Sequence, residues 1–508
     1  MAHITSMKPA KLTLFTALPL LLSPSGWAQI CAEELSIGPV VSANINDPSG
    51  VTDVSDDGEV IVGTAPFGSQ PNPITGQLPR RAFRWTAATG MQDLGAFPGL
   101  SLLDESWATA VSADGTTVIG YAEDSSGGER FAFRWTAATG MQDLGSLGPA
   151  GAPVIASAIA VSADGTVVVG ESSDNVSFRP FRWTVQSGMI ALGSGSPGFR
   201  GRASAVSADG SIVAFNEFPL TTPGFPLPAP AYRWTAQTGA VPLGNYTVVA
   251  MSADGESIIG NVPTVSSSNA YRWRLLAGWM PLGGLPASQG SMALDISADG
   301  SVVVGSSIVA TGLLNQLTSV RWTTEGISEL ATVAGASSSA LVTCVSGDGS
   351  VLAGIDAAVG FRVRASAVGT TYCRPAVASS STCAGLLLVA GPTYAPWSNL
   401  ELRAELLPPN STGFFLVSRT QGFAVQPGGS QGNLCLDGAI GRYVGPGQVQ
   451  SSGAGGGFSL VVGAWNLPTP TGQAVAQPGD TWYFQAWYRD ANPNPTSNFT
   501  DAVSVTFQ

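Results

Sequence analysis

The chain has 508 residues, of which 11% are charged, and its formal net charge is −12. This length exceeds what one compact core normally holds, so we expect two or more domains. The acidic balance argues against nucleic-acid binding, because phosphates need a basic protein face.

The first 28 residues, 1–28, are typical of an export signal. Lys8 and Lys11 precede the apolar run 12–22, and small residues follow before position 29. The run is shorter than a bilayer-spanning helix, and no later segment approaches roughly 18 consecutive apolar residues. We predict that the protein is secreted or lies at the cell surface, with no transmembrane segment once the signal is removed.

Removal of this signal would leave a chain without histidine or lysine, since His3, Lys8 and Lys11 are the only residues of these types. Without the two lysines, the 22 basic residues become 20 arginines against 34 acidic residues, a net charge near −14. Ser-His-Asp triads, Cys-His pairs, histidine metal sites and Schiff-base lysines are then excluded. We predict a protein that is not an enzyme and has no cofactor and no metal site.

A short Ser-x-Asp-Gly turn occurs seven times between residues 55 and 349, and in six cases an Arg-Trp pair follows about 25 residues later. The seventh pair is Arg362-Val363. A period of about 40 to 57 residues is typical of units that bury a core only by stacking or closing into a ring. The repeated residues are Asp57, Asp114, Asp164, Asp209, Asp254, Asp299 and Asp348, with Trp85, Trp135, Trp183, Trp234, Trp273 and Trp322.

Each unit divides into four short strands bounded by Gly, Ser, Asp or Pro. In the third unit the expected strands are 158–161, 166–170, 178–184 and 189–192. We therefore predict an all-β chain with a seven-bladed β-propeller over residues 29–365. A β-solenoid is the alternative, but its rungs are usually nearer 20 to 30 residues.

We interpret the repeated residues as structural. Ser and Asp side chains cap the turn, and Gly adopts the positive φ that a tight hairpin requires. The Trp fills the gap between neighbouring blades, while the preceding Arg points to the opposite side and is expected to pair with an acid. The turns lack the ligand density that calcium prefers.

The connections between strands separate two faces of the expected propeller. The first and third connections of each unit are short and uniform, whereas the second and fourth vary freely, as in 123–130 and 306–318. Function on a rigid scaffold usually lies on variable loops, so we expect a binding site on the variable face. Candidate ligand-binding residues there are Glu123, Asp124 and Glu129.

The sequence suggests how the ring closes and which cysteines pair there. The seventh unit lacks the usual ending, so we expect 35–41 to add a strand to it. None of the five cysteines forms a C-x-x-C motif, and export favours disulfides with one thiol left free. A disulfide between Cys31 and Cys344 would fasten this joint.

The pattern V-S-x-D-G-x-x-V-V-G, followed by F-R-W-T-x-x-T-G-M-x-x-L-G, is nearly complete at 111–145. It resembles the HAF-type extracellular repeat over about residues 50–365. The resemblance implies a bacterial secreted or surface protein that is propeller-shaped. It implies no reaction and no catalytic residues.

After Val363 the composition changes, and we expect a linker at 366–382 and a β-sandwich at 383–508. Five stretches of the tail carry a further resemblance: 370–373, 418–423, 427–435, 440–444 and 482–507. They resemble a C-terminal segment that recurs in secreted proteins of planctomycete- and myxobacteria-like organisms. That resemblance implies a disulfide between Cys373 and Cys435, with Cys383 left over.

One strand of the tail, 482–489, places alternate side chains on two faces. Trp487 and Arg489 share the second face and are candidates for stacking on a sugar ring. The alternative interpretation is a core on one side and a half-covered sheet on the other.

We predict a binding or structural protein whose variable loops hold a polysaccharide, an envelope component or another protein. The alternative is a carbohydrate-active hydrolase that uses paired carboxylates in the propeller funnel. The turn is similar to the Asp-box of sialidases, but its Gly follows Asp directly and no Trp closes the box. The candidate acids for the alternative are Asp104, Glu105, Glu123, Asp124, Glu129, Glu171, Asp174 and Glu217.

Overall fold

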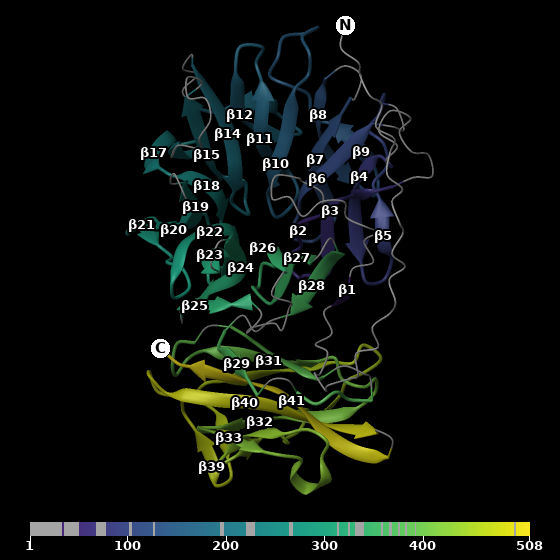
Figure 1. The fold of residues 1–508 in the computed structure, drawn as a ribbon, viewed down its shortest axis with the longest axis vertical. Helices are drawn as coiled ribbons and strands as arrows, with labels where there is room; N and C mark the ends of the chain where they lie inside the picture. Colours follow the sequence, from purple (N-terminus) through teal and green to yellow (C-terminus); the bar gives the residue numbers. More distant parts are fainter. Residues whose placement is uncertain are drawn as a thin grey trace, which may run out of the picture.

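The computed structural model describes most of the chain and shows almost entirely β-structure (Figure 1). No helix in the described part is long and apolar enough to cross a membrane. The described residues are 33–34, 50–67, 78–100, 104–124, 128–193, 198–219, 229–263, 268–311, 314–323, 326–330, 340–356, 359–364, 368–373, 376–380, 384–391, 393–491 and 494–508.

Up to residue 364, the described residues form seven four-stranded antiparallel sheets, numbered here in chain order. Sheets 1 and 2 are β2 (Gly50–Val54), β3 (Val60–Pro66), β4 (Arg80–Thr86) and β5 (Gly90–Asp93), then β6 (Glu105–Val111), β7 (Thr117–Glu123), β8 (Arg130–Thr136) and β9 (Gly140–Asp143). Sheets 3 and 4 are β10 (Ala156–Val161), β11 (Val167–Ser173), β12 (Phe178–Thr184) and β13 (Gly188–Ala191), then β14 (Phe199–Val206), β15 (Ile212–Pro219), β16 (Pro230–Thr235) and β17 (Gly239–Asn245). Sheets 5 and 6 are β18 (Thr247–Met251), β19 (Ser257–Pro263), β20 (Ser268–Arg274) and β21 (Gly278–Pro281), then β22 (Ser288–Ile296), β23 (Val303–Thr311), β24 (Leu314–Thr323) and β25 (Gly326–Glu329). Sheet 7 joins β26 (Leu341–Val345), β27 (Val351–Asp356) and β28 (Val359–Arg364) to β1 (Glu33–Glu34).

The seven sheets follow one another around a central axis, with the first strand of each innermost (Figure 1). Neighbouring innermost strands contact each other all the way round, and β2 of sheet 1 contacts β26 of sheet 7. Apolar clusters lie between successive sheets, and each repeated Trp belongs to such a cluster; Trp135, for example, packs with Val60 of sheet 1 and Val118 of its own sheet. The fold is therefore a β-propeller, in which each sheet buries apolar surface against the next.

The N-terminal side of the chain closes the ring. Strand β1 pairs antiparallel with β28, and Glu33 lies opposite Arg362. The closing strand thus lies just before 35–41, the segment expected from the sequence, which is outside the described residues. Cys344 is buried with a free thiol, so the expected Cys31–Cys344 disulfide is wrong.

A shared network of hydrogen bonds shapes every Ser-x-Asp-Gly turn. In sheet 3, the hydroxyl of Ser162 donates to Asp164 Oδ1 at 2.7 Å, and the same oxygen accepts the N–H of Thr166 at 3.0 Å. The Ser162 hydroxyl also accepts the N–H of Val167 at 2.9 Å. These donors stabilise the ionised carboxylate and lower the pKa of Asp164, and of Asp114 and Asp209 in the same way.

In sheets 1 to 6, the second residue of the turn links its sheet to the next. The N–H of Asp56 donates to the carbonyl of Ala113 at 3.1 Å, and that of Ala113 donates to Ala163 at 3.1 Å. The same bond continues through Ala208, Ala253, Ala298 and Gly347, with lengths of 2.8 to 3.0 Å. These bonds hold the turns close together around the axis.

In sheets 1, 2, 3 and 7, the repeated arginine binds a backbone carbonyl of the next sheet, not the acid expected from the sequence. The guanidinium groups of Arg84 and Arg134 donate to the glycine carbonyls of the following turns, Gly115 at 2.9 Å and Gly165 at 2.8 Å. Arg362 donates to the Gly58 carbonyl at 2.8 Å and so joins sheet 7 to sheet 1. Arg362 also forms an ion pair with Glu59 at 3.4 Å, so at this joint the expected acid is a second, more distant partner.

The C-terminal unit contains two larger sheets that share one apolar core, and Leu387, Phe415 and Trp482 are among its buried residues. One sheet has the order β29-β41-β40-β32-β35, with β36 also on β32, and the other has the order β30-β31-β37. Hairpins β33–β34 and β38–β39 complete it. The bounds are β29 (Thr370–Tyr372), β30 (Leu386–Ala390), β31 (Asn399–Glu405), β32 (Thr412–Ser418), β33 (Thr420–Ala424), the 3-10 turn η1 (Pro427–Gly429), β34 (Leu434–Asp437), β35 (Gly441–Arg442), β36 (Gln450–Ser451), β37 (Phe458–Gly463), β38 (Leu467–Thr469), β39 (Gly472–Ala474), β40 (Thr481–Ala491) and β41 (Pro495–Thr506).

Part of the segment expected as a linker, 366–382, belongs to this unit, because β29 pairs with β41. Directly after β29, Cys373 is joined to Cys435 in a disulfide, with Cα atoms 6.2 Å apart. This bond ties the entry of the unit to β34. Cys383 lies outside the described residues.

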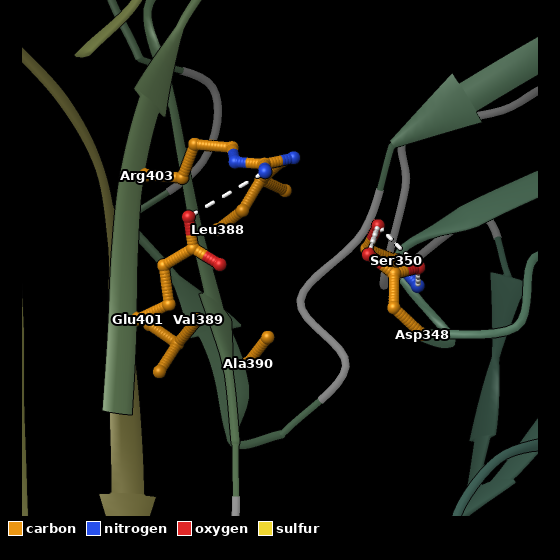
Figure 2. Close-up of a pocket in the computed structure, with 7 residues that line it drawn as sticks. All are labelled: Asp348, Ser350, Leu388, Val389, Ala390, Glu401 and Arg403. Carbon is orange, nitrogen blue, oxygen red and sulfur yellow. Dashed lines mark hydrogen bonds and ion pairs between the residues drawn. The ribbon is translucent and has the colours of Figure 1, made fainter. Parts of the chain in front are cut away.

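The two units meet where the turn of sheet 7 faces strands β30 and β31 (Figure 2). Asp348 and Ser350 lie opposite Glu401 and Arg403, which form an ion pair of 3.5 Å with each other. The gap between the units has a volume of about 10 Å³. A gap of this size holds about one water molecule and is not a ligand site.

We predict that Arg362→Met destabilises the propeller, because it leaves the Gly58 carbonyl at the closing joint without its donor. The expected loss is about 1–3 kcal/mol in the free energy of unfolding. Urea denaturation followed by tryptophan fluorescence measures it, with Arg202→Met, an exposed arginine, as the matched control. Equal unfolding curves for the two variants would contradict the closing role.

Candidate functional site

A cavity of about 180 Å³, the axial channel, is lined by residues from all seven sheets. Two positions of every repeat line it: the second residue of the turn and the residue just before the turn serine. Most of these residues are alanine, valine or another apolar type. The lining consists of Asp53, Val54, Asp56, Ala110, Val111, Ala113, Ala160, Val161, Ala163, Val206, Ala208, Met251, Ala253, Asp295, Ile296, Ala298, Val345 and Gly347.

Three carboxyl groups interrupt this apolar lining. Asp53 and Asp295 occupy the same position of their repeats, two residues before the turn serine. The other repeats have alanine there, except for Cys344 in sheet 7. Asp56 is the second residue of its turn, where the other repeats have alanine or glycine. The acids are thus concentrated on sheets 1 and 6, on either side of sheet 7.

Asp53 and Asp295 each span from one sheet to the next. Asp53 accepts the N–H of Val54 at 2.8 Å with Oδ1 and that of Val111 in sheet 2 at 2.9 Å with Oδ2. Asp295 accepts the N–H of Ile296 and, in sheet 7, of Val345, both at 2.8 Å. The strand edges that face the axis therefore hold both carboxyl groups in place.

The channel disfavours the ionised forms of these acids. Burial raises the pKa of Asp53 to about 8, the charge of Asp295 adds to the rise, and the two N–H donors oppose it. Burial likewise raises the pKa of Asp295 to about 7, and burial with the charge of Asp348 raises that of Asp56. Both Asp53 and Asp295 are partly exposed to the channel, although they lie deep within the ring.

Cys344 lies on the sheet between these two acids. Burial, followed by the charges of Asp53 and Asp295, raises the pKa of its thiol. The thiolate is the reactive form of cysteine, so this residue is not suited to act as a nucleophile.

The arrangement of the acids limits the ligands and reactions that the channel can support. Within the described residues, no three His, Cys, Asp or Glu side chains are grouped closely enough to hold a metal ion. Two carboxyl groups that resist ionisation can instead accept an organic cation, which would supply the missing counter-charge, or they can hold and transfer a proton.

The variable-face acids predicted as ligand residues make contacts within their own connection and with the connection before β10. Glu123 forms an ion pair with Arg130 Nε at 2.8 Å. Glu129 accepts the N–H of Val154 at 3.0 Å, and the backbone N–H of Asp124 donates to the Glu129 carbonyl at 3.0 Å.

The remaining acids predicted for a hydrolase are distributed over sheets 2, 3 and 4 and the connections beside their strands, and they do not line the axial channel. Glu171 pairs with Arg200 at 3.2 Å, and Asp174 pairs with Arg179 at 2.9 Å. Glu105 accepts the N–H of Arg80 at 3.3 Å. The last two, Asp104 and Glu217, are buried.

In the C-terminal unit, the predicted sugar-stacking pair lies on the face that hairpin β33–β34 adjoins. The ring of Trp487 is 5.0 Å from that of Phe414 and packs against a small cluster with Leu436. The Arg489 guanidinium lies 5.3 Å from the Trp487 ring. The neighbours of Trp487 therefore cover much of its ring.

Our sequence reasoning missed the acids of the axial channel. The predictions rest on the residues that recur in every repeat, whereas these acids stand at positions that differ between repeats. Aligning the seven turns would have found Asp53, Asp56 and Asp295, because each replaces a small apolar residue of the repeat. Their meeting on the axis requires the closed ring.

No protein-family model and no curated protein matches the chain. Similar solved structures include oligogalacturonate lyase from Vibrio parahaemolyticus, 11% identical with a TM-score of 0.44 over 64% of this chain and 92% of that one. The β-propeller domain of the Trilobed protease from Pyrococcus furiosus is 11% identical, with a TM-score of 0.42 over 63% and 94%. A putative TolB from Agrobacterium tumefaciens is 12% identical, with a TM-score of 0.34 over 54% and 88%. Values this low define neither a ligand nor a reaction for this chain.

We predict that Asp53 and Asp295 make the fold less stable as the pH rises. Their pKa values of about 8 and about 7 exceed the ordinary 3.8, so the folded state binds more protons than the unfolded chain. Their contribution to the free energy of unfolding is complete below about pH 4 and is lost as the pH rises to about 8. The loss is up to about 1.4 kcal/mol per pH unit for each group.

Urea unfolding from pH 4 to 9 measures this slope. Asp53→Asn with Asp295→Asn should flatten it. The control is Asp93→Asn with Asp143→Asn, two exposed acids at equivalent outer-strand positions, and it should keep the slope of the unchanged protein. The same slope in both double variants would show that the channel acids are ordinary carboxylates.

Proposed function

We propose that the chain is a bacterial secreted or cell-surface binding protein, built as a seven-bladed β-propeller followed by a β-sandwich. We further propose that it holds a cationic group of its ligand in the axial channel. The observation that carries this proposal is the pair Asp53 and Asp295, two carboxyl groups at one repeat position in an otherwise apolar ring. The likeness of the repeat to HAF-type extracellular repeats and the signal-like segment 1–28 support export.

An organic cation fits the electrostatics of the channel. Burial raises the pKa values of Asp53 and Asp295, and no cationic side chain among the residues that line the channel offsets their negative charges. An ammonium or guanidinium group would favour the ionised forms and lower both pKa values. A volume of about 180 Å³ admits one such side chain or amine and not a folded domain. The ligand is therefore a protein or glycan that presents an exposed cationic group.

The proposed cation site lies at the turn end of the propeller. The residues that line the channel belong to the turns or lie just before them, and none belongs to a variable connection. The C-terminal unit packs against the turn of sheet 7 at the same end. We propose that the variable connections, at the opposite end, contact other parts of the same ligand.

We predict that N-acetyl-arginine methylamide and N-acetyl-lysine methylamide bind this protein and that binding strengthens with pH. The bound cation displaces protons from the acid pair. For each proton displaced, the affinity should therefore rise by up to about tenfold per pH unit. Isothermal titration between pH 5 and 9, in buffers of different ionisation enthalpy, measures both the affinity and the released protons.

The matched controls separate charge recognition from general binding. Asp53→Asn with Asp295→Asn should weaken binding by about tenfold or more, about 1.4 kcal/mol, whereas Asp93→Asn with Asp143→Asn should leave it unchanged. The uncharged N-acetyl-citrulline methylamide should bind weakly. Equal affinity for the citrulline and arginine compounds would overturn the proposal.

Hydrolysis of a glycoside is the second candidate, and the same acid pair favours it. Glycosidases need one protonated and one ionised carboxyl group, and pKa values of about 7 and about 8 supply this state near neutral pH. Reducing ends released from a panel of polysaccharides would measure such an activity. It should disappear in Asp53→Asn and in Asp295→Asn separately, and the absence of any release would leave binding as the function of the channel.

A further inference from the structure

A second cavity, with a volume of about 370 Å³, lies between sheets 5 and 6 on the variable face. Its walls are the start of β20, the segment after β21 and the start of β22. We call it the neutral pocket, because none of the described residues that line it is charged. The lining residues that carry the argument are Asn269, Gly283, Gly284, Ser288, Gln289 and Ser291.

The scaffold of the propeller holds the two sides of this pocket together. The hydroxyl of Ser291 accepts the N–H of Ala270 at 3.2 Å, across the boundary between the sheets. The equivalent Ser106 accepts the N–H of Ala82 at 3.0 Å between sheets 1 and 2. This contact therefore belongs to the repeat. The pocket is preformed, and its specific chemistry comes from the residues that the repeat does not fix.

A β-bulge presents Gln289 at the edge of the pocket. The pairing of β22 with β23 shifts between Ser288 and Gly290, which leaves Gln289 as the extra residue, and its side chain is exposed. Two residues before it, Ala287 has a left-handed backbone with φ of 62°. Bulges of this kind change the direction of a side chain, here that of Gln289. Residues with a strained backbone, such as Ala287, often lie beside binding sites.

The chemistry of the lining is that of uncharged hydrogen bonding. Asn269 and Gln289 contribute carboxamides, each with two N–H donors and an accepting oxygen. Gly283 and Gly284 expose their backbone, and Ser288 adds a hydroxyl group. A charged ligand would find no counter-charge here, and an apolar one would leave these polar groups without partners.

We propose that the neutral pocket binds an uncharged saccharide, one or two sugar rings of a neutral polysaccharide. Sugar hydroxyl groups both donate and accept hydrogen bonds, as the carboxamides require, and the volume lies within the range of small-ligand sites. The acids of the axial channel take no part. The proposal therefore stands apart from the proposed cation site.

An array of neutral oligosaccharides built from glucose, galactose, mannose or xylose tests this proposal with the full chain, followed by isothermal titration of the sugars that bind. Asn269→Ala with Gln289→Ala should lower the affinity by about tenfold or more. The control, Gln92→Ala with Gln142→Ala, removes two exposed amides from the outer strands and should bind normally. The Asp53→Asn, Asp295→Asn variant should also bind normally.

The thermal unfolding midpoint shows whether each variant is folded, and Gln289→Glu gives a second test, since its charge should abolish binding with little change in size. Three results would overturn the proposal. They are no binding of any neutral oligosaccharide at millimolar concentration, full affinity in both Gln289 variants, and binding only to uronic-acid oligosaccharides. Loss of sugar binding in the Asp53→Asn, Asp295→Asn variant would place the sugar in the axial channel instead and would equally overturn it.

Discussion

The propeller depends on a hydrogen bond between neighbouring turns, in which the second residue donates its N–H to the carbonyl of the same residue in the next sheet. The turn must therefore hold its N–H and C=O groups in a fixed orientation toward the neighbouring turns. The bonds from serine and aspartate, together with a glycine at positive φ such as Gly165, fix that angle. A Cβ on Gly165 would lie 2.7 Å from Cβ of Thr117 in the preceding sheet. Close approach of the sheets therefore also requires glycine at this position.

The Arg-Trp pair adds a second set of links further from the axis. In sheets 1, 2, 3 and 7 the arginine donates to the glycine carbonyl of the next turn, and the tryptophan of sheet 2 fills the apolar gap toward the preceding sheet. Sheet 7 shows that the two roles are separable. It has lost the tryptophan but keeps Arg362, which binds the Gly58 carbonyl and lies over the ring of Trp85 at 5.1 Å. The arginine persists because the closing joint needs its hydrogen bond, while Val363 packs in the local apolar cluster.

Because the propeller is so regular, the residues that depart from the repeat are informative. Asp53 and Asp295 break the apolar lining of the axis, and each carboxyl group is held by N–H groups of two successive sheets. They join the sheets and also place unfavourable charge in the channel, so one geometry supplies both a structural link and a potential counter-ion for a ligand. On the variable face, Gln289 is a different kind of exception, an extra residue in a paired strand. The two features are chemically distinct, one acidic and one neutral, which suits the two kinds of ligand group that we propose for them.

The sequence by itself determined the all-β class, the four strands of each repeat and the chemistry of the turn, because each of these follows from residues close together in the chain. It misjudged 306–318, expected as a variable connection, where β23 and β24 extend into a long hairpin, and it misjudged the partner of the repeated arginine. Only the tertiary structure decided that Glu33 closes sheet 7, that Thr370–Tyr372 joins the C-terminal unit, and that Asp53 and Asp295 face a common channel. The physical reason is that these contacts join residues far apart in the chain. They arise from the register of the strands and the closure of the ring, which no local pattern encodes.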